Sequence, residues 1–132
     1  MLKVKTKIGP SGIHGTGLFA DEFIPKGTIT WEWNPDFDIA FEENALNSLS
    51  KLMKDYILYY AYFDKDIKKL VLCADNQRYI NHSKSTNIDS TPKKDTASRD
   101  IQIGEELLCN YNLFDDTYFK RMGINETTLN GQ

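Results

Sequence analysis

The stretch from Arg78 to Asn87 restricts the fold of this 132-residue chain more than any other. It reads Arg-Tyr-Ile-Asn-His-Ser-Lys-Ser-Thr-Asn and interrupts a sequence that otherwise favours strands. Asn and His side chains offer hydrogen-bond donors and acceptors in fixed directions, as a buried ligand site requires. Asn, Ser and Thr also gather in ordinary turns, so the stretch alone fits a polar turn equally well.

Two further motifs, one near each end of the chain, favour a site. The first contains Gly15-Thr16-Gly17, where two glycines one residue apart allow the backbone to approach a ligand closely. It lacks the third glycine of a dinucleotide-binding fingerprint and the lysine of a phosphate-binding loop. The second runs from Gly104 to Tyr111 and reads Gly-Glu-Glu-Leu-Leu-Cys-Asn-Tyr, a turn that leads into a strand.

The composition is that of one ordinary soluble domain. Hydrophobic residues make up 40% of the chain and charged residues 27%, which is usual for globular proteins. No apolar run is long enough to cross a bilayer. The first seven residues are rich in lysine and lack the apolar core of a signal peptide. We therefore expect a cytoplasmic protein, with the host nucleus as the alternative for a viral protein or an effector.

The charge distribution bears on the kind of partner. A net charge of −3 argues against a protein that binds nucleic acid through phosphate contacts. The segment from Glu32 to Asp66 is the most acidic, with eight acidic residues and three lysines. Such a surface would attract a lysine-rich peptide, although a solvated face has the same composition.

The two cysteines, Cys73 and Cys109, are far apart in the sequence. Their number and spacing exclude a zinc ribbon. Adding His14 and His82 gives four potential ligands, but their spacing matches no metal site. We expect no metal and interpret both cysteines as small buried residues in strands.

Short strands dominate the expected secondary structure. One helix is expected at 42–55, where apolar residues recur every three or four positions. The segment 88–95 is expected to be an exposed loop, and 112–122 a short helical turn. Together these features predict a mainly β domain over residues 1–122 and a polar tail over 123–132. The expected strands are 2–8, 18–20, 28–33, 37–41, 56–63, 69–74 and 106–111.

Taken in order, the three motifs resemble the SET domain of protein-lysine methyltransferases. That family has a Gly-x-Gly strand, an Arg-Phe/Tyr-x-Asn-His-Ser motif, and a Gly-Glu-Glu-Leu segment that ends in a tyrosine. The corresponding segments here are Gly15–Gly17, Arg78–Ser83 and Gly104–Tyr111. The resemblance extends over nearly the whole chain, and three motifs in the family's order form a specific signal.

The chain departs from the common family pattern in two places. Lys84-Ser85-Thr86-Asn87 stands where many members have Cys-x-Pro-Asn, and there are no cysteine-rich zinc modules. The chain is therefore most similar in organisation to the minimal, stand-alone SET proteins of viruses and bacteria. Cys109 stands where a tyrosine is often found, which leaves the number of transferred methyl groups open.

The resemblance implies a β-clip-like SET fold of several small sheets and one modest helix, with knot-like threading of the C-terminal segment. It implies S-adenosylmethionine as the cofactor and a lysine side chain of a protein as the methyl acceptor. Tyr111 would be the catalytic residue and would also contact the cofactor. The other implied cofactor-binding residues are Gly15, Thr16, Gly17, Arg78, Asn81, His82 and an aromatic residue of the tail, Phe119 or else Phe114.

Two functional interpretations follow from this resemblance. The first is an active lysine methyltransferase that acts on a histone or another basic protein. The second is a catalytically weak SET-like module that binds a peptide or the cofactor. Neither involves direct contact with nucleic acid or membrane, and a homodimer, the form of the viral type, is left open.

Overall fold

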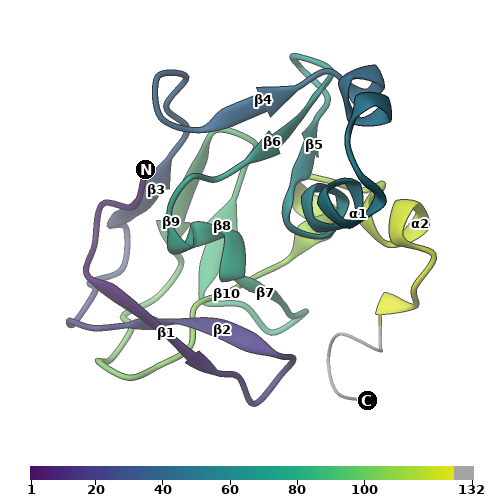
Figure 1. Cartoon of the computed structure of the whole chain (residues 1–132). Helices are drawn as coiled ribbons and strands as arrows, with labels where there is room; N and C mark the ends of the chain where they lie inside the picture. Colours follow the sequence, from purple (N-terminus) through teal and green to yellow (C-terminus); the bar gives the residue numbers. More distant parts are fainter. Residues whose placement is uncertain (127–132) are drawn as a thin grey trace.

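The computed structural model of the chain describes residues 1–126 and is built mainly from short strands (Figure 1). In this part of the chain the strands form four small sheets of two or three strands each. The expected mainly β class, with small sheets and one modest helix, is confirmed. The expected polar tail over 123–132 falls largely outside the described residues.

The two-stranded sheets hold the sequence motifs. Strand β1 (Thr6–Pro10) pairs with β2 (Thr16–Ala20) in an antiparallel hairpin, whose connecting loop leads into the Gly-x-Gly motif. Strand β7 (Asn81–His82) lies parallel to β10 (Leu108–Cys109). This parallel pair places the central motif beside the last one, as the expected threading of the C-terminal segment requires.

A three-stranded antiparallel sheet forms the middle of the domain. Its order is β3 (Ile29–Glu32), β9 (Lys94–Ala97) and β8 (Ile88–Ser90). The prediction of an exposed loop over 88–95 is therefore wrong. Its polar composition and Pro92 indicated a loop, but Pro92 lies only in the tight turn between β8 and β9, where it is not needed for pairing.

The other three-stranded sheet has the order β4 (Ile39–Phe41), β6 (Lys69–Leu72) and β5 (Tyr62–Asp64). It packs against α1 (Lys51–Tyr60), which lies beside it in Figure 1. The apolar residues at this contact are Leu46, Ile57, Ala61, Leu70 and Leu72. A second cluster, centred on Leu18, Ile24, Ile88, Ile101 and Leu107, holds the remaining sheets together.

The helix lies further along the chain than expected. Residues 43–48 form a 3₁₀ helix, η1 (Glu43–Ser48), and the α-helix starts afresh at Lys51. Ser50 causes the restart, because its side-chain oxygen accepts a hydrogen bond from the Met53 N–H at 3.3 Å and caps the new helix. The tyrosines of residues 56–60, expected in a strand because aromatic residues favour strands, therefore lie on α1.

The first and last expected strands also differ from the structure. β1 begins at Thr6 and continues through Gly9 and Pro10, beyond the expected end of the strand at Ile8. Pro10 is tolerated because it is the last residue of a two-stranded ladder. The expected strand at 106–111 is reduced to the two residues of β10, since the chain turns at once into the 3₁₀ helix η3 (Tyr111–Leu113).

The C-terminal segment is anchored by one buried ion pair. Asp115 accepts hydrogen bonds from the Phe63 N–H at 2.9 Å and from Arg121 at 3.0 Å. Arg121 also donates to the carbonyl of Ala61 at 3.1 Å. These bonds fix α2 (Tyr118–Met122) against the end of α1 and the start of β5, and so hold η3 in place.

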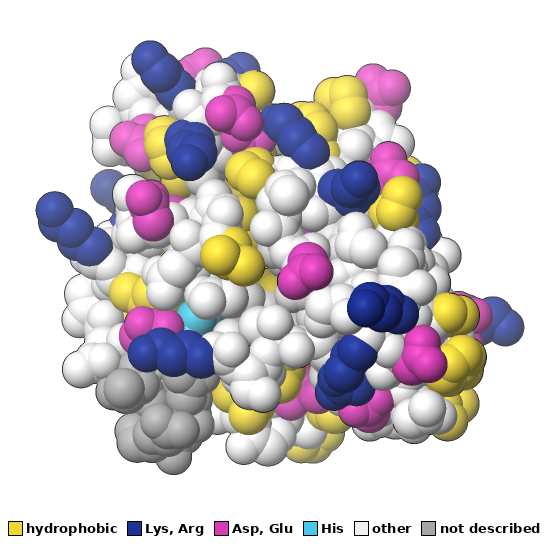
Figure 2. Space-filling view, turned by 180° about the vertical axis from the view of Figure 1, so that it is seen from behind, with side chains coloured by type: hydrophobic (Ala, Val, Ile, Leu, Met, Phe, Trp, Pro, Cys, Tyr) yellow, Lys and Arg dark blue, Asp and Glu magenta, His cyan; other side chains and the backbone are white. Residues whose placement is uncertain are grey.

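No helix in residues 1–126 is long and apolar enough to cross a membrane. On the face shown in Figure 2, basic and acidic side chains are interspersed and do not segregate into a patch of one sign. The structure gives no metal-binding group of three or more His, Cys, Asp or Glu side chains within its described residues.

Replacing Leu70 with alanine tests the contact between α1 and its sheet. Leu70 is fully buried, so Leu70→Ala should lower the free energy of unfolding by about 2–5 kcal/mol, as core truncations do. Urea unfolding followed by circular dichroism measures this change. Leu52→Ala is the matched control, because Leu52 lies on α1 with 78% of its side chain exposed, and it should shift stability by less than about 0.5 kcal/mol.

Candidate active site

A cavity of about 280 Å³ lies where the three sequence motifs meet. The Gly-x-Gly loop contributes Gly15 and Thr16, the central motif contributes Arg78 and Asn81, and the last motif contributes Tyr111. Residues that are far apart in the sequence thus line the same cavity. About half of the remaining lining residues are aromatic, namely Trp31, Tyr59, Tyr60, Tyr62, Tyr79, Phe114 and Tyr118.

The side-chain amide of Asn81 joins the motifs. Its Nδ2 lies 2.9 Å from the carbonyl oxygen of His14, 3.2 Å from that of Thr16 and 3.0 Å from Oε1 of Glu106. Two N–H groups shared among three acceptors leave nothing on the amide nitrogen for a ligand. Any contact between Asn81 and a cofactor is therefore expected through its backbone.

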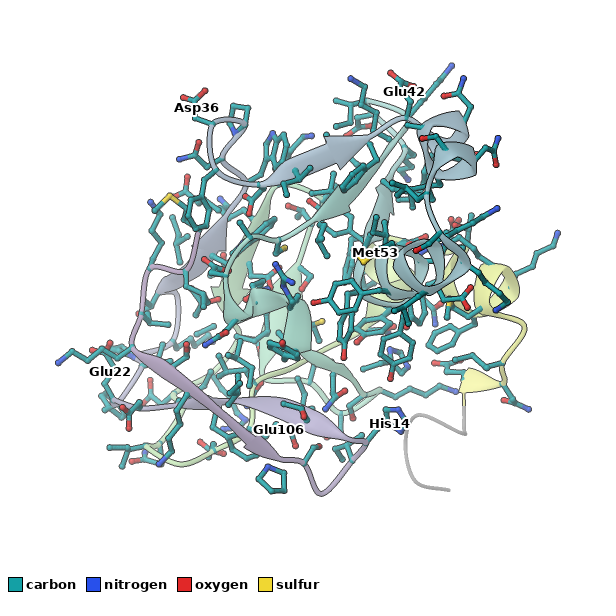
Figure 3. All side chains as sticks on the ribbon, in the orientation of Figure 1. His14, Glu22, Asp36, Glu42, Met53 and Glu106 are labelled. Atoms are coloured by element: carbon teal, nitrogen blue, oxygen red, sulfur yellow. The ribbon has the colours of Figure 1, made fainter. Side chains whose placement is uncertain are left out.

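The two glycines of the first motif have different physical roles. Gly15 has φ of +52°, a left-handed conformation that favours glycine, and the space where a side chain would begin is open. At Gly17 a Cβ atom would lie 2.1 Å from Oε1 of Glu106. Figure 3 shows Glu106 against the β1–β2 hairpin and His14 at the end of that hairpin. Gly17 therefore makes room for the carboxylate that Asn81 binds.

His82 is fully buried behind Tyr111, with both ring nitrogens engaged. Its Nδ1 accepts the backbone N–H of Tyr111 at 3.0 Å, so the ring proton belongs on Nε2, which donates to Glu126 at 2.7 Å. Burial lowers the pKa of His82, and the Glu126 carboxylate partly opposes this. The neutral ring is thus the form that holds Tyr111 in place.

The Tyr111 phenol is the polar group of the third motif. Its hydroxyl donates to the carbonyl of Ile80 at 2.5 Å. Burial raises its pKa well above the ordinary value, and the nearby Cys109 adds to the rise. The hydroxyl therefore stays protonated at neutral pH and can orient a ligand, but it is a poor acid.

Arg78 and His14 extend the site toward α1. Arg78 donates from Nε to the Cys73 carbonyl at 3.1 Å and from Nη1 to the Tyr56 hydroxyl at 2.6 Å. His14 Nε2 lies 2.8 Å from the hydroxyl of Tyr59. The guanidinium of Arg78 is thus a fixed positive charge in the cavity wall.

A scan against family models matches residues 15–112 to the SET domain. This match covers most of the chain and includes all three motifs. The chain belongs to the SET-domain family.

Solved structures with the same SET fold include a Chaetomium thermophilum polycomb repressive complex 2. One of these structures is a complex with H3K27me3 and H3K27M, and its matching chain is 26% identical to this one. The match has a TM-score of 0.60 and covers 82% of this SET domain and 14% of that chain. Another, bound to S-adenosylmethionine, is 26% identical, with a TM-score of 0.63 over 93% of this domain and 17% of that chain. The SET domain thus spans less than a fifth of those chains. No curated protein matches it.

The residues of this SET domain suit the family's cofactor. Beside Gly15 the space at the backbone is open, which lets an elongated ligand lie against the loop. Arg78 offers a positive charge for a carboxylate. The aromatic walls offer ring faces to a sulfonium cation. Arg78 is already held in place by its hydrogen bonds to Cys73 and Tyr56.

The SET domain's structure does not bring all expected site residues to the cavity. Gly15, Thr16, Arg78, Asn81 and Tyr111 line it. Gly17 and His82 lie behind it and support lining residues. The expected contacts with a cofactor remain predictions.

Of the two tail aromatics, Phe114 lines the cavity. Phe119 does not line the cavity and packs on two other rings. Its ring centroid lies 4.9 Å from that of His82 and 6.0 Å from that of Tyr111. The contact expected between Phe119 and the adenine also stays a prediction, and the cavity lining favours Phe114 for it.

Sequence reasoning missed much of the aromatic wall and the buried carboxylate of Asp95 that lines the cavity. The spacing of Tyr56, Tyr59 and Tyr60 is helical as well as strand-like, and this signal could have placed them on one face of α1. Nothing in the sequence around Asp95 marks that residue as buried.

The Gly17 contact can be tested by mutation. Gly17→Ala should lower the free energy of unfolding by about 1–3 kcal/mol, because the new methyl group must displace Glu106 from Asn81. Thermal and urea unfolding measure the loss. Gly12→Ala is the control, since nothing lies within 4 Å of its Cβ position. A Gly17→Ala variant as stable as this control would contradict the described packing.

Proposed function

We propose that this SET domain transfers the methyl group of S-adenosylmethionine to the side-chain amine of a lysine in a protein substrate. The observation that carries the proposal is the convergence of three motifs on one cavity, with a fixed tyrosine hydroxyl among aromatic walls. The SET family membership supports the reaction class. The similar solved structure bound to S-adenosylmethionine supports the choice of cofactor.

The protein's part in this reaction is binding and alignment. When bound, S-adenosylmethionine supplies an electron-poor methyl group on a positively charged sulfur. Arg78 would hold the carboxylate of the cofactor, and the backbone between His14 and Thr16 would lie along it. Asn81 keeps that loop in place through its amide. Alignment of a nucleophile with the methyl group then provides much of the rate acceleration.

The aromatic wall would act on the substrate. A free lysine has a pKa near 10.4 and is mostly charged at neutral pH. A channel lined by Tyr60, Tyr62 and Phe114 would desolvate the ammonium group and favour its neutral form. Tyr111, held by His82 and Ile80, would orient the amine with its hydroxyl.

We further propose a histone tail or another lysine-rich protein as the substrate. One similar solved structure is a complex with H3K27me3 and H3K27M, and that supports a histone for this domain. The acidic composition of residues 32–66 also suits a basic partner.

Tyr111→Phe tests the role of the hydroxyl. The purified protein is incubated with labelled S-adenosylmethionine, a mixture of histones and a bacterial lysate. The rate at which label enters the protein bands is then measured. We expect Tyr111→Phe to lower the labelling rate about 100-fold, the scale at which small misplacements slow a reaction. Cofactor affinity, measured by calorimetry, should stay unchanged.

Tyr118→Phe provides the comparison for this experiment. It also loses a hydroxyl that lies in the cavity wall and donates to a backbone carbonyl, that of Tyr59 at 2.9 Å. Its labelling rate should fall less than that of Tyr111→Phe. Equal labelling rates in wild type and Tyr111→Phe would show that the Tyr111 hydroxyl does not take part in the reaction. Cofactor binding by a wild type that labels none of these proteins would favour the weak binding module.

Asn81→Ala tests the cofactor site separately from catalysis. Loss of the amide releases the carbonyls of His14 and Thr16, so the loop should move and the dissociation constant for S-adenosylmethionine should rise about tenfold, which equals the loss of about 1.4 kcal/mol. Calorimetry measures it. Asn47→Ala, at an exposed position of η1, is the control and should bind like the wild type. Unchanged affinity in Asn81→Ala would show that the central motif does not shape the cofactor site.

A further inference from the structure

One of the buried polar groups that line the cavity is the carboxylate of Asp95. Asp95 lies on β9, the central strand of its sheet, directly opposite Trp31 of β3 on one side and Ser90 of β8 on the other. Directly paired residues present their side chains on the same face of a sheet. Asp95 is 4% exposed and lines the cavity together with Tyr111. A carboxylate buried at the centre of a sheet therefore faces the site.

This carboxylate has no positive partner. Gln77 donates from Nε2 to Oδ2 of Asp95 at 2.6 Å. Across residues 1–126, no Lys, Arg or His nitrogen forms an ion pair with Asp95, unlike the buried Asp64 and Asp115, which pair with Lys93 and Arg121. A buried charge without a counter-ion is costly. Its place in the wall leaves the cavity as the side from which a cation can reach it.

The indole of Trp31 gives a second, independent sign that this end of the cavity takes a polar ligand. Trp31 is 2% exposed and lines the cavity, yet its Nε1–H has no hydrogen-bond partner within the described residues. Buried N–H groups are nearly always paired in folded proteins. An unpaired donor opposite a carboxylate that lacks a counter-ion is not what an apolar core contains.

We propose that Asp95 accepts the proton that the substrate's ammonium group must lose before it can be methylated. The inference rests on the proposed function and adds a proton acceptor to it. The N–H bond of the ammonium breaks and its electron pair stays on nitrogen, while the proton forms an O–H bond with Asp95. The products are a neutral amine and a neutral carboxylic acid. Asp95 then returns the proton to solvent, so no further reactant is needed.

The affinity of Asp95 for a proton suits this role. Burial raises its pKa to about 7, and the neighbouring Ser90 hydroxyl and the hydrogen bond from Gln77 keep the pKa from rising further. The Ser90 hydroxyl forms no hydrogen bond of good geometry, so its effect comes from proximity. A base with a pKa near the working pH transfers protons most efficiently.

The other groups around Asp95 stay uncharged or paired near neutral pH. Burial raises the pKa values of Cys73, beside β6, of Cys109 on β10, and of Tyr62 on β5. The other buried carboxylates among the described residues, Asp38, Asp64 and Asp115, are held in ion pairs with the N-terminal amine, Lys93 and Arg121. Asp95 is therefore the group in this part of the wall that should titrate near pH 7.

The decisive experiment compares the pH dependence of kcat in wild type and Asp95→Asn. An asparagine keeps an oxygen acceptor for Gln77 but cannot take up the proton. In the wild type, kcat should rise with pH up to about 7, where Asp95 becomes ionised, and then level off. In Asp95→Asn, kcat should be about 100-fold lower at pH 7, the usual scale of a general base. It should keep rising tenfold per pH unit above 7, since only spontaneous loss of the proton remains.

Two features of this comparison separate proton transfer from a purely structural role. Asp89→Asn, an exposed change on β8, is the matched control and should follow the wild-type profile. His14 also lines the cavity. It is present in every variant, so it cannot account for a difference between their pH profiles. A constant deficit of Asp95→Asn at every pH, or no deficit at all, would overturn the inference.

A binding measurement decides the matter without relying on turnover. n-Butylammonium has the shape and charge of a lysine side chain, and its binding can be followed by the NMR signal of the Trp31 indole N–H. It should bind the wild type more tightly at pH 8 than at pH 6, because Asp95 is charged only at the higher pH. The pH difference should vanish in Asp95→Asn. Equal binding in both proteins at both pH values would overturn the role of Asp95, whereas a wild type that labels no protein but binds as expected would overturn only the proposed function.

Discussion

The parallel pairing of β7 with β10 is the interaction on which the site depends. Only two residues of each strand take part, Asn81 opposite Leu108 and His82 opposite Cys109. So short a ladder needs support, and Asn87 provides it. Its side chain accepts the Leu108 N–H and donates to the Glu106 carbonyl, both at 2.8 Å. The two asparagines of the central motif thus have different tasks: Asn81 binds the first motif and the Glu106 side chain, whereas Asn87 binds the backbone of the last motif.

Glu106 explains why the three motifs occur together. It receives a hydrogen bond from Asn81 and occupies the space that Gly17 leaves free. A larger residue at Gly17, or the loss of either polar partner, would disturb the other two motifs. Each motif taken alone resembles an ordinary turn because the reason for its residues lies in the other two. The three motifs therefore indicate a shared site only when they are considered together.

Sequence reasoning reached the fold class and the residues of the main hydrogen-bonded network, because Gly, Asn, His and Tyr have restricted chemistry at fixed spacings. It failed where local preference and packing disagree. The tyrosines of α1 prefer strands locally, yet the cap at Ser50 and the burial of Ile57 make that segment a helix. Asp95 was missed because no local rule places a carboxylate in the centre of a sheet. Its burial depends on Trp31, which is distant in the sequence, and on Ser90 across the tight turn.

The position of β10 in the chain also has a consequence for synthesis. A chain emerging from the ribosome carries the Gly-x-Gly hairpin and the central motif well before Leu108–Tyr111 is made. Until then β7 has no partner strand, and Nδ1 of His82 has no backbone N–H to accept. The cavity cannot close over a ligand in such a nascent chain. The order of translation therefore makes the finished cavity a feature of the nearly complete domain.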